Sequence, residues 1–455
     1  MNRRYFLKTS AVGAGGLWLS SWGQAAATSG RPPRILLRSS WQSVNIGDIG
    51  HTPGALSLIE KHFPEAEVTL WPGNLGHGSR DLLTKGYPRL KIVEGSLGQD
   101  SNQPAAGSAL AKAWHETDIY LSGSGSNFPS SAQAAAFHKA TGKPVGVFGV
   151  STDPISGFGG DRDPEGGTLK NLRERALKLP PTHLPENWRY VIDRAAFFFC
   201  RDTLSRDYLR AQGVKTPLLE FGPDAQLGMH LRDDAKGLPW LAEHGLQNGK
   251  FICVIPRLRY TPYYRMGTRG RAADDDIKDA INLRWKESDH AKLRDLIVRY
   301  VRATGNKVLA CAEVTYQIAL AKEMLVDPLP ADVKRNVIWR DSFWLPDEAA
   351  SIYAQAEALI CMDCHSPLIA YRHGTPAFYI RNATDTWKGQ MYADIGVADW
   401  LFEADETSGE ELWSRLAPLH ADPIKARARV KAVMAGVEKL QRGMVETLRA
   451  AVRRT

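Results

Sequence analysis

The sequence predicts an α/β protein built from two doubly wound parallel-sheet domains. Short apolar runs alternate with helical patterns along most of the chain, which is typical of parallel sheets covered by helices on both faces. The chain has 455 residues, whereas one hydrophobic core rarely extends beyond about 250–300 residues. Its content of 43% hydrophobic and 24% charged residues is that of an ordinary globular protein.

The first domain is expected over residues 34–235. Its predicted strands are residues 35–37, 66–71, 119–121, 145–148, 197–200 and 218–219. Helical patterns at residues 55–62, 132–141 and 204–212 separate some of these strands. Residues 151–187 are rich in glycine, proline and charge and lack a regular pattern, so they are expected to form either a lid or a solvated loop.

The second domain is expected over residues 250–400, followed by C-terminal helices over residues 405–455. Its predicted strands are residues 251–255, 308–310, 337–339, 358–360 and 377–380. A basic amphipathic helix from residue 423 onward is expected to pack back across the domains. Residues 256–271 interleave arginines with tyrosines. This pattern is expected to form either a surface that stacks on sugar rings or a solvated loop.

The first 27 residues resemble a twin-arginine export signal. Arg3 and Arg4 precede a short, weakly apolar stretch that ends in small residues, and the stretch is too short for the roughly 20 residues of a membrane span. We therefore expect export of the folded protein by the twin-arginine translocation machinery to the periplasm or another extracytoplasmic compartment, without a stable membrane anchor. Removing Arg3, Arg4 and Lys8 lowers the net charge from +8 to +5 (8 minus 3), and export makes nucleic acid an unexpected partner.

The most informative segment covers residues 358–380. An apolar strand there ends in a polar turn with His365, and the next helix begins at Ser366 and stops near Gly374. Free N–H groups and the helix dipole favour anions at such a helix start. We therefore expect an anionic ligand beside His365, the alternative being a histidine that only stabilises its turn.

Five cysteines, at positions 200, 253, 311, 361 and 364, lie mostly in apolar runs and are expected to be buried thiols. Cys361, Cys364 and His365 also match the C-x-x-C-H pattern of covalent haem attachment. An apolar strand argues against haem, because attachment needs an exposed segment. A Cys361–Cys364 disulfide stays open, whereas a zinc pair finds little support without a second cysteine pair, and no metal is expected.

Several motifs follow predicted strands in a fixed order. They are Asn45-Ile-Gly47-Asp48, Gly123-Ser-Gly125, Arg201-Asp202 and Gly222-Pro-Asp224 in the first half, then His365-Ser366, Gly374-Thr-Pro376 and Lys388-Gly389 in the second. None is specific alone. As an ordered set over nearly the whole mature chain, they resemble the polysaccharide pyruvyl transferase family.

The resemblance implies a GT-B-like fold with the active site in the cleft between the domains. It also implies transfer of pyruvate from phosphoenolpyruvate, the donor substrate, to two hydroxyls of a carbohydrate or polysaccharide acceptor as a cyclic ketal, without a cofactor. His365 would be the acid or base, Arg201 would bind a carboxylate or phosphate, and Lys388 would neutralise phosphate. The expected substrate-binding residues are Asn45, Gly47, Asp48, Gly123, Gly125, Arg257, Asp363 and Ser366.

Two features depart from the family pattern. Asp363 stands where the family commonly has an arginine, two residues before the histidine. Phosphoenolpyruvate is a cytoplasmic metabolite, so an exported transferase would lack its donor. Two alternatives therefore stay open: an exported ketal hydrolase or other sugar-modifying enzyme, and a non-catalytic protein that binds acidic polysaccharide.

Overall fold

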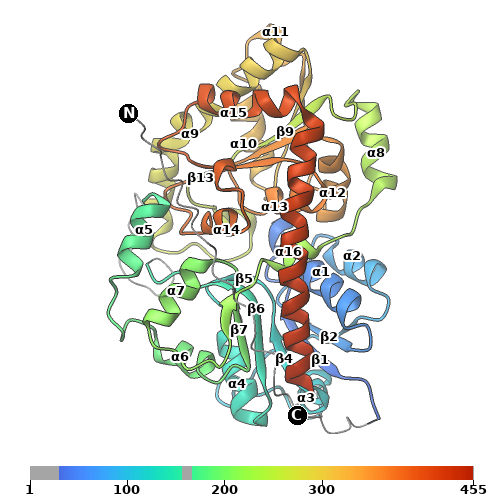
Figure 1. The fold of residues 1–455 in the computed structure, drawn as a ribbon, viewed down its shortest axis with the longest axis vertical. Coiled ribbons are helices and arrows are strands. Elements are labelled where there is room, and N and C mark those ends of the chain that lie inside the picture. Colours follow the sequence, from blue (N-terminus) through green and yellow to red (C-terminus); the bar gives the residue numbers. More distant parts are fainter. Residues whose placement is uncertain (1–29, 156–166, 454–455) are drawn as a thin grey trace, which may run out of the picture.

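Two parallel sheets, one in each half of the chain, form the framework of the computed structural model, which describes residues 30–155 and 167–453 (Figure 1). All the pairings between neighbouring strands of these sheets are parallel. The predicted fold class is therefore confirmed. The expected export signal, residues 1–27, lies outside the described residues.

The first sheet has the strand order β3-β2-β1-β4-β6-β7-β8, with β5 paired to β6. Its strands are β1 (Arg34–Ser39), β2 (Glu67–Pro72), β3 (Lys91–Ile92), β4 (Ile119–Ser122), β5 (Gly125–Ser126), β6 (Val145–Ser151), β7 (Phe197–Cys200) and β8 (Leu219–Phe221). Its helices are α1 (Ile46–His62), α2 (Ser79–Gly86), α3 (Ala109–Glu116), α4 (Ser131–Thr141), α5 (Leu169–Ala176), α6 (Glu186–Ile192) and α7 (Thr203–Ala211). Strand order reverses beside β1, and ligands of open α/β sheets bind at the carboxyl edge of such a reversal.

The second sheet has the order β11-β10-β9-β12-β13-β14 and reverses beside β9. Its strands are β9 (Phe251–Ile255), β10 (Lys307–Ala310), β11 (Val337–Trp339), β12 (Ala358–Cys361), β13 (Ala377–Arg381) and β14 (Leu401–Glu403). Its helices are α8 (Asp234–Glu243), α9 (Asp275–Thr304), α10 (Gln317–Ala321), α11 (Ala331–Lys334), α12 (Pro346–Gln355), α13 (Ser366–Arg372), α14 (Gln390–Asp394) and α15 (Gly409–Ala421). Residues of β9, β12 and β13 are buried throughout, as expected for central strands covered on both faces.

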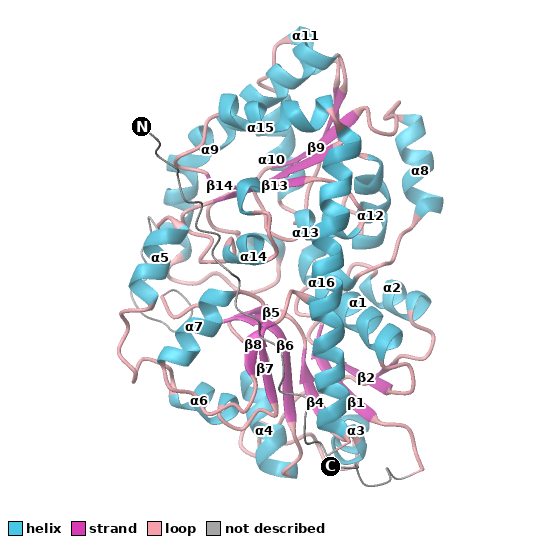
Figure 2. Ribbon diagram, in the orientation of Figure 1, coloured by secondary structure: helices cyan, strands magenta, loops and turns pink. Residues whose placement is uncertain are grey.

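The last helix, α16 (Pro423–Val452), runs along both domains (Figure 2). Val430 and Met434 pack into the core of the second domain, whereas Val445 and Leu448 pack into the core of the first. One continuous helix therefore contributes apolar side chains to both cores and ties the domains together.

The domains also meet at the start of α1. The amide of Ile46 donates to the carbonyl of Glu313 over 3.0 Å, and the amide of Thr315 donates to the carbonyl of Val44 over 3.0 Å. The segment after β10 therefore pairs with the segment after β1. These backbone bonds bring the carboxyl edges of the two sheets face to face.

One segment differs from its predicted character. Residues 151–187, expected to lack regular structure, contain α5 and the start of α6, and residues 156–166 lie outside the described part. In the arginine–tyrosine segment, Arg265 and Tyr264 both bond Asp279, so much of its charge is neutralised locally. No helix within residues 30–155 and 167–453 combines the length and apolarity that a membrane span needs.

Candidate functional site

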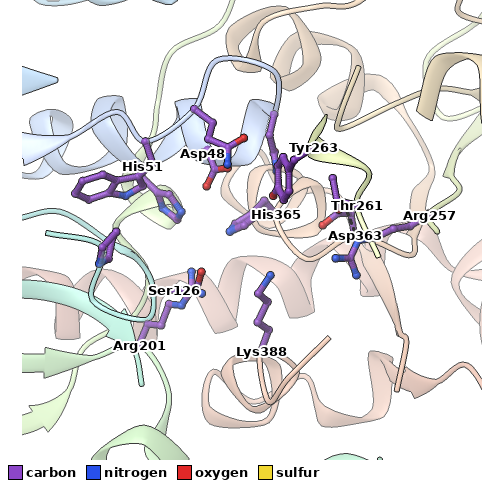
Figure 3. Close-up of a pocket in the computed structure, with 14 residues that line it drawn as sticks. Asp48, His51, Ser126, Arg201, Arg257, Thr261, Tyr263, Asp363, His365 and Lys388 are labelled. Carbon is purple, nitrogen blue, oxygen red and sulfur yellow. Dashed lines mark ion pairs between the residues drawn. The ribbon is translucent and has the colours of Figure 1, made fainter. Parts of the chain in front are cut away.

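A cavity of about 190 Å³ lies where the carboxyl edges of the two sheets meet (Figure 3). It is lined by Trp41, Gln42, Asn45, Asp48, His51, Ser126, Pro129, Arg201, Arg257, Thr261, Tyr263, Asp363, His365 and Lys388. The first eight belong to the first domain and the other six to the second. The lining is mostly polar and charged, which suits a small hydrophilic ligand.

The start of α1 forms one wall of the cavity. Asn45 caps this helix, because its side-chain oxygen accepts from the amide of Gly47 over 2.7 Å. Asp48 then projects into the cavity from the first turn. Gly47 lies against the ring of His365, and a Cβ at this position would overlap the Cβ, Cγ and Nδ1 atoms of that histidine. Glycine is therefore required here for close approach of the two domains.

Arg201 and His51 form a buried network around one carboxylate, that of Asp224 at the start of the 3₁₀ turn Ala225–Gly228. Nη1 of Arg201 donates to Oδ2 of Asp224 over 2.9 Å, and Nδ1 of His51 lies 3.0 Å from Oδ1. Nε of Arg201 donates to Ser151 over 2.8 Å. Nη2 of Arg201 and Nε2 of His51 have no hydrogen-bond partner among the described residues, so both are available to a ligand.

His365 is held by Glu313, which follows β10. Nδ1 of His365 lies 3.2 Å from Oε1 of Glu313, while Oε2 accepts from the amides of His365 and Ser366 over 3.3 and 2.6 Å. Burial disfavours a charged imidazole, but Cys364 and Glu313 more than compensate and raise the pKa of His365 well above its ordinary value. His365 is thus kept protonated beside the cavity and is able to act as an acid.

Asp363 and Arg257 form a second buried ion pair at the cavity. Nε of Arg257 lies 3.3 Å from Oδ2 of Asp363, and its Nη1 pairs with Asp385. Burial raises the pKa of the Asp363 carboxyl, but Arg257 and then Lys388 oppose this effect and lower it overall. Asp363 is therefore ionised, and Arg257 is neutralised by two carboxylates.

Lys388, after β13, is the remaining cation of the cavity lining. Its ammonium group points toward the open centre (Figure 3), and it has no ion pair within the described part of the chain. An unpaired ammonium group and the free Nη2 of Arg201 form a small site for an anion.

Two groups of side chains approach metal-binding distance: His51, Asp224 and His365, and Asp363, Cys364 and His365. Asp224 already accepts from Arg201, His51 and the amide of Gln226, and Asp363 pairs with Arg257. Both carboxylates are therefore occupied by protein donors, and the donor sets fit hydrogen-bond networks better than metal sites.

The cysteines are free, buried thiols. Cys361 ends the buried strand β12, and Cys364 is equally inaccessible. Covalent haem attachment does not fit, since both sulfur atoms lie in the protein core and not on a surface that could meet a porphyrin. The two thiols are not joined as a disulfide.

The structure brings together residues that the sequence places far apart. Seven of the predicted site residues line the cavity: Asn45, Asp48, Arg201, Arg257, Asp363, His365 and Lys388. Four others lie behind the lining: Gly47 against His365, Gly123 against Ser39, Gly125 against Trp41 and Pro129, and Ser366 with its amide on Glu313.

Sequence reasoning missed His51 and Glu313. Glu313 comes three residues after the end of the buried strand β10, and a carboxylate at that edge of a parallel sheet was a usable signal. His51 lies inside a helix among apolar neighbours and carries no motif, so only its contact with Asp224 reveals it.

Comparison with known proteins shows a family and a fold. The model of a family described as "Polysaccharide pyruvyl transferase" matches residues 45–384. Among solved structures, a protein assigned as UDP-N-acetylglucosamine 2-epimerase from Listeria monocytogenes shares 13% identity at a TM-score of 0.52, with 88% of this chain and 90% of that chain covered. The UDP-GlcNAc 2-epimerase from Neisseria meningitidis shares 11% identity at a TM-score of 0.50, covering 91% and 99%. These likenesses show a GT-B-like fold. Comparison with curated proteins finds no match.

Proposed function

Since the chain belongs to the polysaccharide pyruvyl transferase family, we propose that it transfers the pyruvyl group of phosphoenolpyruvate to two hydroxyls of a sugar as a cyclic ketal. The observation that carries this proposal is the arrangement of one protonated histidine and two available cationic groups around a single small cavity. His365, Nη2 of Arg201 and Lys388 are those groups.

Each of the three groups matches one requirement of the reaction. The methylene carbon of an enol phosphate must receive a proton, and His365 is an acid held in place by Glu313. The donor carboxylate needs a directional cation, and the free edge of the Arg201 guanidinium supplies one. The phosphate needs charge compensation as it leaves, which Lys388 provides as a point charge.

The size of the cavity also favours a small donor. Sites for drug-sized ligands have volumes of about 300–1,000 Å³, whereas this cavity has about 190 Å³. A three-carbon enol phosphate is compatible with such a space, and the acceptor sugar would approach from its open side. Thr261 and Tyr263 lie on the cavity wall from the second domain and offer a hydroxyl and a ring to that sugar.

A second candidate is hydrolysis of an existing pyruvyl ketal. It is favoured by the carboxylates of Asp48 and Asp363, which lie in the same cavity as His365. A carboxylate and an imidazolium could activate water and protonate a leaving oxygen, and this reaction needs no phosphorylated donor. Export to the periplasm, which we propose from the N-terminal sequence, would place the protein beside polysaccharide and away from phosphoenolpyruvate.

One assay distinguishes these functions. The mature protein is incubated with phosphoenolpyruvate and a panel of sugars and polysaccharides, and separately with a pyruvylated polysaccharide, while phosphate and pyruvate are measured. Phosphate release that depends on an acceptor supports the transferase. Pyruvate release without a phosphorylated donor supports the hydrolase. Glycan binding that is equal in the wild type and in His365→Ala, without either product, would indicate a non-catalytic binding protein.

The role of the Glu313 carboxylate provides a sharper test of the acid. Glu313→Gln keeps hydrogen-bonding groups at this position but removes the charge that favours protonated His365. The pKa of His365 should fall, so activity should be lost at a lower pH on the alkaline side than in the wild type. An unchanged alkaline limb would contradict the assignment of His365 as the acid.

A further inference from the structure

His51 is a second imidazole at the cavity, and nothing in the proposed function has used it. It lies one helical turn after Asp48 on α1 and lines the cavity. His51 is fully buried, and its Nδ1 lies 3.0 Å from Oδ1 of Asp224. Nε2, the other ring nitrogen, has no hydrogen-bond partner among residues 30–155 and 167–453.

The contact with Asp224 determines where the proton of His51 lies. Burial raises the pKa of the Asp224 carboxyl, but His51 and Arg201 lower it overall to well below its ordinary range, so Asp224 is ionised. An ionised carboxylate only accepts hydrogen bonds. His51 must therefore donate from Nδ1 to Asp224, and in its neutral form the lone pair of Nε2 is free on the cavity side.

The two histidines are arranged in the same way but differ in their electrostatic surroundings. Their ring centroids are 5.0 Å apart and the rings meet edge to face. Glu313 has no arginine or lysine partner in the described part of the chain, and its charge acts on His365. Asp224 shares its charge between His51 and Arg201. Glu313 therefore favours the charged form of His365, whereas the negative charge of Asp224 is already balanced by the guanidinium of Arg201.

We propose that His51 is a second catalytic residue, the base that takes the proton of the first attacking sugar hydroxyl. This inference rests on the proposed transferase function. It also divides the proton transfers between two neighbouring imidazoles. A base whose Nδ1 is fixed by a carboxylate, with Nε2 facing the reacting group, follows the logic of a carboxylate–histidine pair in acyl transfer.

The steps balance in atoms and charge. His365 gives its proton to the methylene carbon of phosphoenolpyruvate, the first hydroxyl oxygen bonds to C2, and His51 takes the hydroxyl proton. The bond from C2 to the phosphate oxygen then breaks, and the departing phosphate takes the proton from His51. The second hydroxyl bonds to C2 and returns a proton to His365. One ketal and one hydrogen phosphate result, and both histidines regain their starting states.

His51→Asn is the informative variant. The asparagine amide reproduces the Nδ1–H donor toward Asp224 but lacks a nitrogen at the position of Nε2. The matched control is His290→Asn on α9, because His290 is equally buried and its Nε2 is also unpartnered, but it does not line the cavity. We expect His51→Asn to lower kcat by about 100-fold or more with little change in KM for phosphoenolpyruvate.

The pH profile separates a base from a structural residue. The charged groups facing His51 are Asp224 before the 3₁₀ turn, Arg201 after β7, His365 before α13 and Asp48 on its own helix. The pH profile of kcat should differ between the wild type and His51→Asn, because only the wild type carries the proposed base. Added imidazole should restore part of the rate of His51→Asn, and His290→Asn should behave as the wild type.

Failure of this inference is distinct from failure of the proposed function. Absence of acceptor-dependent phosphate release by the wild type overturns the proposed function. Normal turnover by His51→Asn, or a pH profile of His51→Asn identical to that of the wild type, overturns only the role of His51. Nitrogen NMR of ¹⁵N-histidine-labelled wild type needs neither activity nor a variant that folds, and a proton found on Nε2 of neutral His51 also overturns the assignment.

Discussion

Gly47→Ala should impair catalysis through His365, although the substitution adds only one methyl group at the start of a helix. The new Cβ would lie closer than 3.0 Å to three atoms of His365, whereas ordinary contacts begin at 3.4 Å. Either the ring or the first turn of α1 must therefore move by roughly 1 Å. Displacement of that size at a catalytic group costs about 100-fold in rate, or about 2.7 kcal/mol of transition-state stabilisation.

The effect on stability should be smaller than the effect on rate. Alanine favours a helix over glycine by about 1 kcal/mol, whereas overpacking a buried contact costs about 1–3 kcal/mol. The free energy of unfolding should therefore fall by at most about 2 kcal/mol. Urea denaturation measures this change, and phosphate release from phosphoenolpyruvate gives kcat/KM.

Gly436→Ala on α16 is the matched control, because a Cβ there would meet no atom within 4 Å. It should leave kcat/KM unchanged and raise the free energy of unfolding slightly. Retention of full activity by Gly47→Ala would show that His365 tolerates displacement and that the domain contact does not position the acid.

Three further predictions follow from the charges and thiols around the site. Lys388→Ala should raise KM for phosphoenolpyruvate about tenfold, equivalent to about 1.4 kcal/mol, while Lys388→Arg should retain most of the affinity; equal KM values would contradict the anion site. Asp224→Asn leaves Arg201 buried without its charge partner, so the free energy of unfolding should be about 3–5 kcal/mol lower than that of the wild type at pH 7. Because folding lowers the pKa of Asp224, this stabilisation is complete above about pH 4 and is lost on acidification, so the difference measured by urea denaturation should shrink at low pH. Thiol titration should detect no reactive cysteine in the native protein and five after unfolding, whereas a Cys361–Cys364 disulfide would leave three.

The fold could be predicted because its signal is local. Central strands such as Phe251–Ile255 and Ala358–Cys361 are apolar runs of five and four residues, and chain order then restricts the sheet to parallel connections. The short edge strands β3 and β14 were missed because two or three residues carry too little pattern. α5 was missed because its sequence is charged and only Leu172 and Ala176 are buried.

The candidate site could be predicted only in part, because its decisive contacts cross between domains. His365 and Arg201 stand at strand ends, which sequence reasoning can identify. The ion-pair partner of Arg201 is Asp224 and not one of the nearer acids Asp202 and Asp207. Neither the contact of Gly47 with His365 nor the bond of His51 to Asp224 has a local sequence signature. Both depend on how the chain folds over long separations.

The substitution at Asp363 determines how much negative charge the cavity is able to bind. Asp363 does not act alone: it pairs with Arg257, which also pairs with Asp385, so this arginine is no free cation for a ligand. Charge compensation for phosphoenolpyruvate is then left to Arg201 and Lys388, and Arg201 already serves Asp224. An arginine at position 363 would add a cation where this chain has an ion pair. Compared with a site of that kind, this cavity should show a stronger preference for ligands that carry only one carboxylate. The ratio of the affinities for phosphoenolpyruvate and for a pyruvyl ketal therefore tests whether the cavity suits transfer or hydrolysis.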